Sequence, residues 1–215
     1  MALSKVDYNS LNVTAAASKA LKWNSGADGF ETGDLVGSMV LLETITASTS
    51  DLVTFDSNID STYAEYIFKF TDVHPATDNV SFQVNFRDGS TAYDATKTST
   101  AFYAYHDEGD TSTALAYSAG GDLAQGTGVQ PLVLSMGNGN DECCSGTLHL
   151  FNPSSTTFVK HFISRTASYS YQDYTYDWYT AGYNNVTAAI DGVQFKFSAG
   201  NIDAGTIKMY GIKDS

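Results

Sequence analysis

The most regular feature of the chain is the alternation of apolar and polar residues over short stretches. Between Val80 and Phe86 every second side chain is apolar, and the side chains between them are polar. This period of two is typical of a β-strand with one face in a core and the other in water. The stretches that we expect to form strands, by this pattern or by a short apolar run, are 38–46, 51–55, 63–70, 80–87, 102–105, 113–117, 131–135, 146–151, 157–165, 169–179 and 187–190.

The end of the chain, 191–212, predicts a hairpin of two more strands. Apolar and polar residues alternate over 193–197, a glycine-bearing loop follows at 198–201, and a second apolar strand covers 207–212. A hairpin this close to the C-terminus indicates that the last strand is held in a sheet and does not fray. An earlier turn is expected at 74–79, where a His-Pro pair interrupts the strand pattern.

The beginning of the chain has a different pattern. Residues 14–23 are rich in Ala and predict a short helix, which a glycine-bearing segment ends. A helix this short is marginal alone, so it must dock on another surface, with Leu21 and Trp23 as anchors. That surface is either its own domain or a neighbouring subunit, in which case the segment is an attachment arm. We therefore expect an N-terminal arm over 1–34 and a β domain over 35–215.

These elements select the fold class. Many short strands, one short helix and no alternation of strands with helices are typical of an all-β protein built as an antiparallel β-sandwich. A jelly-roll-like order is favoured, because the strand number suits it and the last strand returns to a sheet. An immunoglobulin-like order is disfavoured, since the sequence has no Cys…Trp…Cys framework.

Composition narrows the possible partners. The chain has 11 basic and 24 acidic residues, a formal net charge of −13, and it contains 14 Tyr and 12 Phe. Nucleic acids and anionic membranes bind clustered Lys and Arg, so we expect neither as a partner. No signal peptide or long apolar run is visible, so synthesis and retention in a cytosol are expected. The adjacent Cys143 and Cys144 are expected to be free thiols, because neighbouring cysteines seldom bridge each other.

Catalytic and metal-binding patterns are weak. The four histidines are scattered, and none lies beside Cys or Glu at the spacing of metal ligands. The acidic loops 107–110 and 138–142 offer oxygen atoms but do not match a calcium loop. No nucleophile, phosphate-binding or zinc-protease motif is present. We expect no enzymatic activity, no cofactor and no metal site.

The segment 169–179 is the strongest candidate for a binding surface. Tyrosine and tryptophan provide broad, stiff surfaces that both protein interfaces and sugar-binding faces use. A mostly buried strand pair with its hydroxyl groups at the rim would give the same sequence, so three interpretations remain open. The aromatic residues of the segment are Tyr169, Tyr171, Tyr174, Tyr176, Trp178 and Tyr179.

Three blocks of the sequence combine strand and turn residues. They are Tyr-Ala-Glu-Tyr-Ile-Phe-Lys-Phe-Thr-Asp-Val-His-Pro-Ala-Thr-Asp at 63–78, the stretch 141–162 with its Asn-Pro-Ser-Ser turn, and Gly-Asn-Ile-Asp-Ala-Gly-Thr-Ile-Lys-Met-Tyr-Gly-Ile at 200–212. These blocks resemble virion proteins of marine tailed bacteriophages. The likeness covers about residues 37–215. The three blocks consist of residues that are typical of strands and turns, so the resemblance implies no catalytic residues.

The resemblance implies a non-enzymatic structural component of the virion, assembled in the host cytoplasm. A tail fibre or appendage attached through the N-terminal arm is favoured, and a capsid decoration (cement) protein is the alternative. A carbohydrate-binding module that contacts host surface glycans through 169–179 is the competing class. The implied partners are other virion proteins and further copies of the chain, with a trimer favoured. No membrane insertion is expected.

Overall fold

The computed structural model describes residues 19–26, 28–34 and 38–213 and forms only strands, turns and loops there. The chain divides into two compact units between Ser38 and Met39. The strands are β1 (Lys19–Trp23), β2 (Phe30–Asp34), β3 (Met39–Thr46), β4 (Val53–Phe55), β5 (Glu65–Pro75), β6 (Val80–Arg87), β7 (Lys97–Asp107), β8 (Thr113–Tyr117), β9 (Gln130–Met136), β10 (Cys144–Phe151), β11 (Lys160–Tyr169), β12 (Tyr174–Asn184), β13 (Gly192–Phe197) and β14 (Ile202–Ile212).

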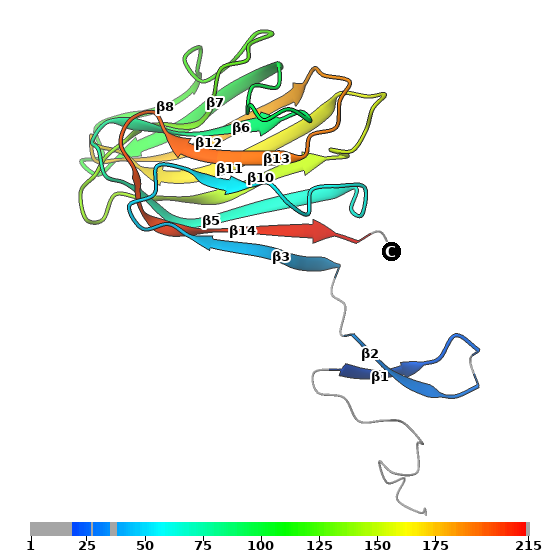
Figure 1. Ribbon diagram of the computed structural model, residues 1–215. Coiled ribbons are helices and arrows are strands. Elements are labelled where there is room, and N and C mark those ends of the chain that lie inside the picture. The colour runs from blue at the N-terminus through cyan, green and yellow to red at the C-terminus, as the bar shows by residue number, and fades with distance from the viewer. Residues whose placement is uncertain (1–18, 27, 35–37, 214–215) are drawn as a thin grey trace, which may run out of the picture. The chain divides into compact units, whose positions relative to one another are not determined.

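The larger unit contains two sheets in which all neighbouring strands are antiparallel. The large sheet has eight strands in the order β3-β14-β5-β10-β11-β12-β7-β8, and the small sheet has four in the order β4-β13-β6-β9. The all-β, antiparallel character expected from the alternating pattern is therefore confirmed. Figure 1 shows β14, in red, between β3 and β5.

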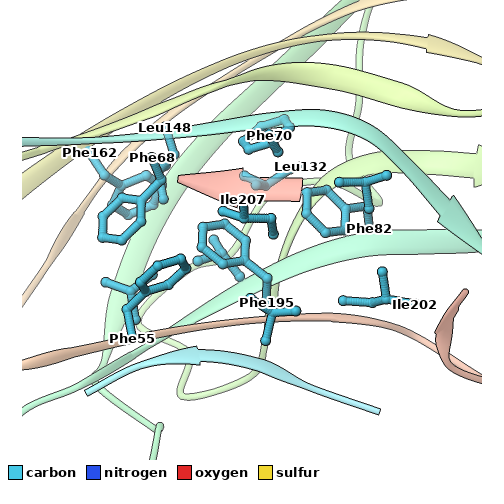
Figure 2. Packing of buried hydrophobic residues seen from close by; sticks show 14 of the residues in the cluster. Phe55, Phe68, Phe70, Phe82, Leu132, Leu148, Phe162, Phe195, Ile202 and Ile207 are labelled. Atoms are coloured by element: carbon cyan, nitrogen blue, oxygen red, sulfur yellow. The ribbon is translucent and has the colours of Figure 1, made fainter. Parts of the chain in front are cut away.

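One hydrophobic core holds the two sheets face to face, as in a sandwich (Figure 2). The rings of Phe55 in β4 and Phe68 in β5 lie 5.3 Å apart, and those of Phe70 in β5 and Phe82 in β6 are also 5.3 Å apart. Phe195 of β13 lies among these four rings. The apolar residues that alternate along β6 in the sequence belong to this core, so they mark the inward face of the strand. Burying one such ring contributes roughly 1.5–3 kcal/mol to stability.

The predicted C-terminal hairpin is wrong, although both of its strands exist. β13 pairs with β4 and β6 in the small sheet, whereas β14 pairs with β3 and β5 in the large sheet. The loop between them therefore crosses from one sheet to the other. Periodicity shows which side chains face the core but does not show which strand is the neighbour. The expectation that the last strand is held in a sheet is confirmed.

Several other boundaries differ from the prediction. His74 and Pro75 belong to the end of β5, so the turn begins after them, and residues 187–190 form no strand. The segment 169–179 is the end of β11, a turn and the start of β12. Pro75 pairs with Ile202, the first residue of β14, and the register of the two strands shifts on both sides of Ala204. The pairing is therefore irregular at this end of β5, where a proline without an N–H donor is tolerated.

The smaller unit is a two-stranded hairpin of β1 and β2. Lys19–Trp23 pair with Phe30–Asp34, and the rings of Trp23 and Phe30 stack at 4.4 Å. The predicted helix over 14–23 is therefore wrong for Lys19–Trp23, and residues 14–18 lie outside the described residues. Cross-strand pairing and ring stacking override the helix propensity of a short Ala-rich segment.

Candidate binding surfaces

The Tyr-rich segment does not form one surface, because the alternation of β12 divides it between the two faces of the large sheet. Trp178 is 4% exposed and belongs to the core, so its face is the inner one, which also carries Tyr174 and Tyr176. Tyr179 lies on the outer face.

The inner face carries an aromatic cluster that the sequence analysis found only in part. β7 pairs with β12 so that Tyr105 faces Tyr176 and Tyr103 faces Trp178. The neighbouring rings lie 4.8–6.1 Å apart, and Tyr105 stacks on Tyr174 at 5.1 Å. We call this cluster the aromatic floor, and its members are Tyr103, Tyr105, Tyr174, Tyr176 and Trp178. The alternation of Tyr103 and Tyr105 in the sequence was the missed signal.

The environment of the aromatic floor is apolar but contains unpaired polar atoms. Burial, reinforced by the neighbouring tyrosines, raises the pKa of Tyr176 to about 12. The indole Nε1 of Trp178 and the hydroxyl of Ser168 are buried without a hydrogen-bond partner. Ser168 pairs in register with Tyr176, so both lie on the same face. Four of the five rings are partly exposed at the edge of the core.

On the outer face, Tyr179 belongs to a second aromatic group. The ring of Phe102 stacks on it at 4.7 Å, and the Arg165 guanidinium lies 5.1 Å from its centroid. Arg165 also donates to both carboxylate oxygens of Asp177, at 3.0 and 2.8 Å, and this hydrogen-bonded pairing lowers the pKa of Asp177. Leu115 of β8 pairs in register with Ala104 of β7, so it lies on the same outer face, and 75% of it is exposed.

Tyr169 and Tyr171 join neither group in a continuous surface. The Tyr169 hydroxyl donates to Asp173 at 3.2 Å, within the turn between β11 and β12. Tyr171 lies in the same turn and is 38% exposed, and its backbone N–H donates to the Ser135 carbonyl. Of the six residues expected to form a surface, the structure brings together three, and these lie on the inner face.

A shallow groove crosses the outer face, where β10, β11, β12 and β7 carry small side chains. It has a volume of about 550 Å³ and is lined by Ala104, Gly146, Ala167, Arg165 and His106, among others. Its lining combines these small residues with the Arg165–Asp177 pair.

The expected arm residues lie on one face of the β1–β2 hairpin. Leu21 and Trp23 alternate along β1, and 47% and 61% of their surfaces are exposed. Phe30 of β2 faces Trp23 in register and is 38% exposed. The opposite face carries the ion pair of Lys22 with Glu31, at 3.3 Å. The hairpin is therefore amphipathic, with one aromatic face and one charged face.

The remaining candidate residues have structural partners. His149 Nδ1 lies 2.6 Å from Glu65, and His74 Nε2 lies 2.9 Å from the Gly139 carbonyl. Asp107 accepts from the backbone N–H groups of Thr111 and Ser112, so it ties the loop after β7. Cys143 and Cys144 are both thiols, and burial raises their pKa.

Within the described ranges, no three side chains of His, Cys, Asp or Glu gather in a group that could hold a metal ion. Over the same residues, no helix has the length and apolar character needed to cross a membrane. Comparison of the chain with family models, curated proteins and solved structures gives no match.

Proposed function

We propose that the protein is a non-enzymatic structural component of a bacteriophage virion, attached to a neighbouring protein through its N-terminal hairpin. The observation that carries the proposal is the β1–β2 hairpin. An isolated two-stranded hairpin is marginally stable in water at best, because it has no core of its own. The aromatic face of Leu21, Trp23 and Phe30 therefore requires a surface to cover it, and a docking site on another protein supplies one.

The strand order of the larger unit supports a displayed jelly roll. Counted along the chain, the eight strands β3, β4, β5, β6, β9, β10, β13 and β14 lie in the orders 1-8-3-6 and 2-7-4-5 in the two sheets. Among these eight strands, each lies in the other sheet from the one counted before it, except that β6 and β9 share the small sheet, and this is the order of a double Greek key. β7 and β8, with β11 and β12, extend the large sheet by four strands.

The assignment to a phage rests on the resemblance, and the fold adds one point in its favour. The three blocks that carry the resemblance fall on β5, on β10 with the start of β11, and on β14. These strands are neighbours in the order β14-β5-β10-β11. Blocks far apart in the sequence therefore form one continuous region of the large sheet, as a shared structural unit would require. A tail appendage is our first choice, and a capsid decoration protein is the alternative.

Replacement of the aromatic face tests the attachment. In a phage that carries the gene, Trp23→Ala combined with Phe30→Ala is expected to remove the protein from purified particles by tenfold or more. The matched control is Lys22→Ala combined with Glu31→Ala on the charged face, which leaves incorporation within twofold. Incorporation of the aromatic variant at the normal level would show that the hairpin docks elsewhere, for example on its own β domain.

A carbohydrate-binding role is the second candidate, and the aromatic floor favours it. The four tyrosine rings carry hydroxyl groups and Trp178 carries an indole N–H, so the floor suits the mixed apolar and polar faces of a pyranose. The net charge of −13 favours neutral over acidic glycans as ligands. The floor, with Tyr103 and Tyr105 included, replaces the continuous surface expected over 169–179.

Fluorescence titration tests this role directly. The chain has two tryptophans, so a Trp23→Phe variant leaves Trp178 as the reporter within the floor. Neutral hexa-oligosaccharides of glucose, mannose and xylose are the probes, and binding is expected to shift the emission of Trp178. Tyr105→Ala should weaken binding by about tenfold, whereas Tyr179→Ala on the outer face leaves it unchanged. Equal loss in both variants, or no shift with any probe, excludes the floor as a glycan site.

A further inference from the structure

Three buried polar side chains form a row across β11, β12 and β7. Lys160 pairs in register with Asn184, and Asn184 pairs in register with Lys97. Residues in register share one face of a sheet, so all three lie on the inner face, two positions from the core residue Phe162 along β11. Each of the three is 0% exposed.

Contacts within the protein use only part of the hydrogen-bonding capacity of the row. Lys97 Nζ donates to the Gly128 carbonyl at 2.8 Å, and Lys160 Nζ donates to the Val186 carbonyl at 2.6 Å. An ammonium has three N–H donors, so each lysine keeps two donors beyond this bond. Between them, both Nδ2 and Oδ1 of Asn184 are buried without a hydrogen-bond partner.

The charge of the row is not balanced locally either. Neither lysine belongs to an ion pair in the described part of the chain. Burial lowers the pKa of both ammonium groups, that of Lys97 to about 8, and Asp88 and Asp94 oppose this only from a distance. A buried ammonium group destabilises the fold unless its charge is paired, and neither lysine has a described carboxylate within ion-pair distance.

We propose that the row of Lys97, Asn184 and Lys160 is a binding site for a small inorganic anion, with chloride as the simplest occupant. The anion accepts from both ammonium groups and from Asn184 Nδ2, while Asn184 Oδ1 accepts from a remaining ammonium hydrogen. One ion thus supplies the missing counter-charge and the missing acceptors together. It also joins the ends of three neighbouring strands, so occupancy stabilises this part of the large sheet. The inference is independent of the attachment function.

The row favours an anion over water alone. A water molecule can accept two hydrogen bonds but brings no charge, so it leaves both ammonium groups unpaired. A cation is excluded by the two positive charges. An apolar ligand would leave the two amide atoms of Asn184 as they are. Among these classes of ligand, only an anion both neutralises the positive charge of the two lysines and accepts the hydrogen bonds that the row leaves unmade.

A crystal structure of the full chain grown in sodium bromide tests the site. Bromide replaces chloride and is identified by its anomalous scattering. The expected result is an anomalous peak within hydrogen-bond distance of Lys97 Nζ, Lys160 Nζ and Asn184 Nδ2. Ordered water at this position without an anomalous peak, or bromide only at the protein surface as an adventitious ion, would overturn the proposal.

Thermal unfolding provides an independent readout in solution. At constant ionic strength, replacing gluconate by chloride is expected to raise the Tm by about 3 °C and to saturate, as for binding at one site. Lys97→Met combined with Lys160→Met should abolish the rise. The matched control is Lys69→Met with Lys208→Met, a pair in register on β5 and β14 that lies outside the row. A rise that persists without Lys97 and Lys160 contradicts the proposal.

Discussion

At the scale of single residues, neighbours in the sequence have opposite roles because they lie on opposite faces of a strand. Trp178 is buried in the core and contacts Tyr103 and Tyr176, whereas Tyr179 stacks on Phe102 and lies near Arg165 on the outer face. A cluster of aromatic letters therefore does not by itself define a surface. The register with β7 decides which rings meet, and it adds two tyrosines that are more than sixty positions away in the chain.

A pH-dependent contribution to stability belongs to a single residue, Asp107. Hydrogen bonds from Thr111 and Ser112 lower its pKa in the folded protein. A carboxylate with a lowered pKa stabilises the fold above its unfolded pKa, and the contribution is lost as the pH falls through the folded pKa. Asp107→Asn is therefore expected to flatten the dependence of the unfolding free energy on pH below about 4.

Urea unfolding at a series of acidic pH values measures this effect. The control is Asp110→Asn in the same loop, at an exposed carboxylate that lies 3.2 Å from His106 Nε2. If the two variants keep the same acid dependence as the unaltered protein, the hydrogen bonds of Asp107 do not contribute to the acid stability.

At the scale of elements, the crossing between β13 and β14 determines the topology. β14 lies between β3 and β5, and its register with β5 shifts on both sides of Ala204. Gly205, which follows Ala204, has a φ of +120° and lies close to the backbone of β5. The irregular start of β14 thus depends on a residue without a side chain.

Gly205→Ala is expected to destabilise the protein by about 2 kcal/mol. A Cβ at this position would meet the Asp72 carbonyl oxygen at 2.7 Å, in a backbone conformation that other residues rarely adopt. Gly128→Ala is the matched control, because a Cβ there meets no atom within 4 Å. Chemical denaturation of both variants measures the difference, and equal stability would mean that β14 can begin without strain.

At the scale of the whole molecule, the core lies entirely within the larger unit. Among the residues that the structure describes, its buried members run from Ala47 to Met209.

Removal of residues 1–38 is expected to leave a folded domain with a Tm within about 3 °C of the full chain, since the core remains complete. Calorimetry and light scattering measure its unfolding and its oligomeric state. A trimer that persists without the hairpin favours an appendage whose β domains associate, and a monomer favours a decoration protein held by its hairpin. A large fall in Tm would instead mean that the hairpin packs on its own β domain.

The all-β fold class and most of the strands could be predicted from the amino-acid sequence alone. β6 begins and ends where the alternation predicts, because a strand with one buried face must alternate. β8 also has the predicted bounds, although none of its residues is buried. The amphipathic character of the first unit also follows from Leu21 and Trp23, although its hairpin was mistaken for a helix. The alternation of apolar and polar residues shows which face of a strand is buried, and this period of two residues is the same in whichever sheet the strand lies.

Only the tertiary structure decided which strands are neighbours and which polar groups meet. The row of Lys97, Asn184 and Lys160 joins positions from three strands, and nothing near any of them in the sequence indicates the others. The same holds for the aromatic floor and for the crossing from β13 to β14. Pairing between distant strands depends on the packing of the two sheets around the shared core, and that packing is a property of the whole chain.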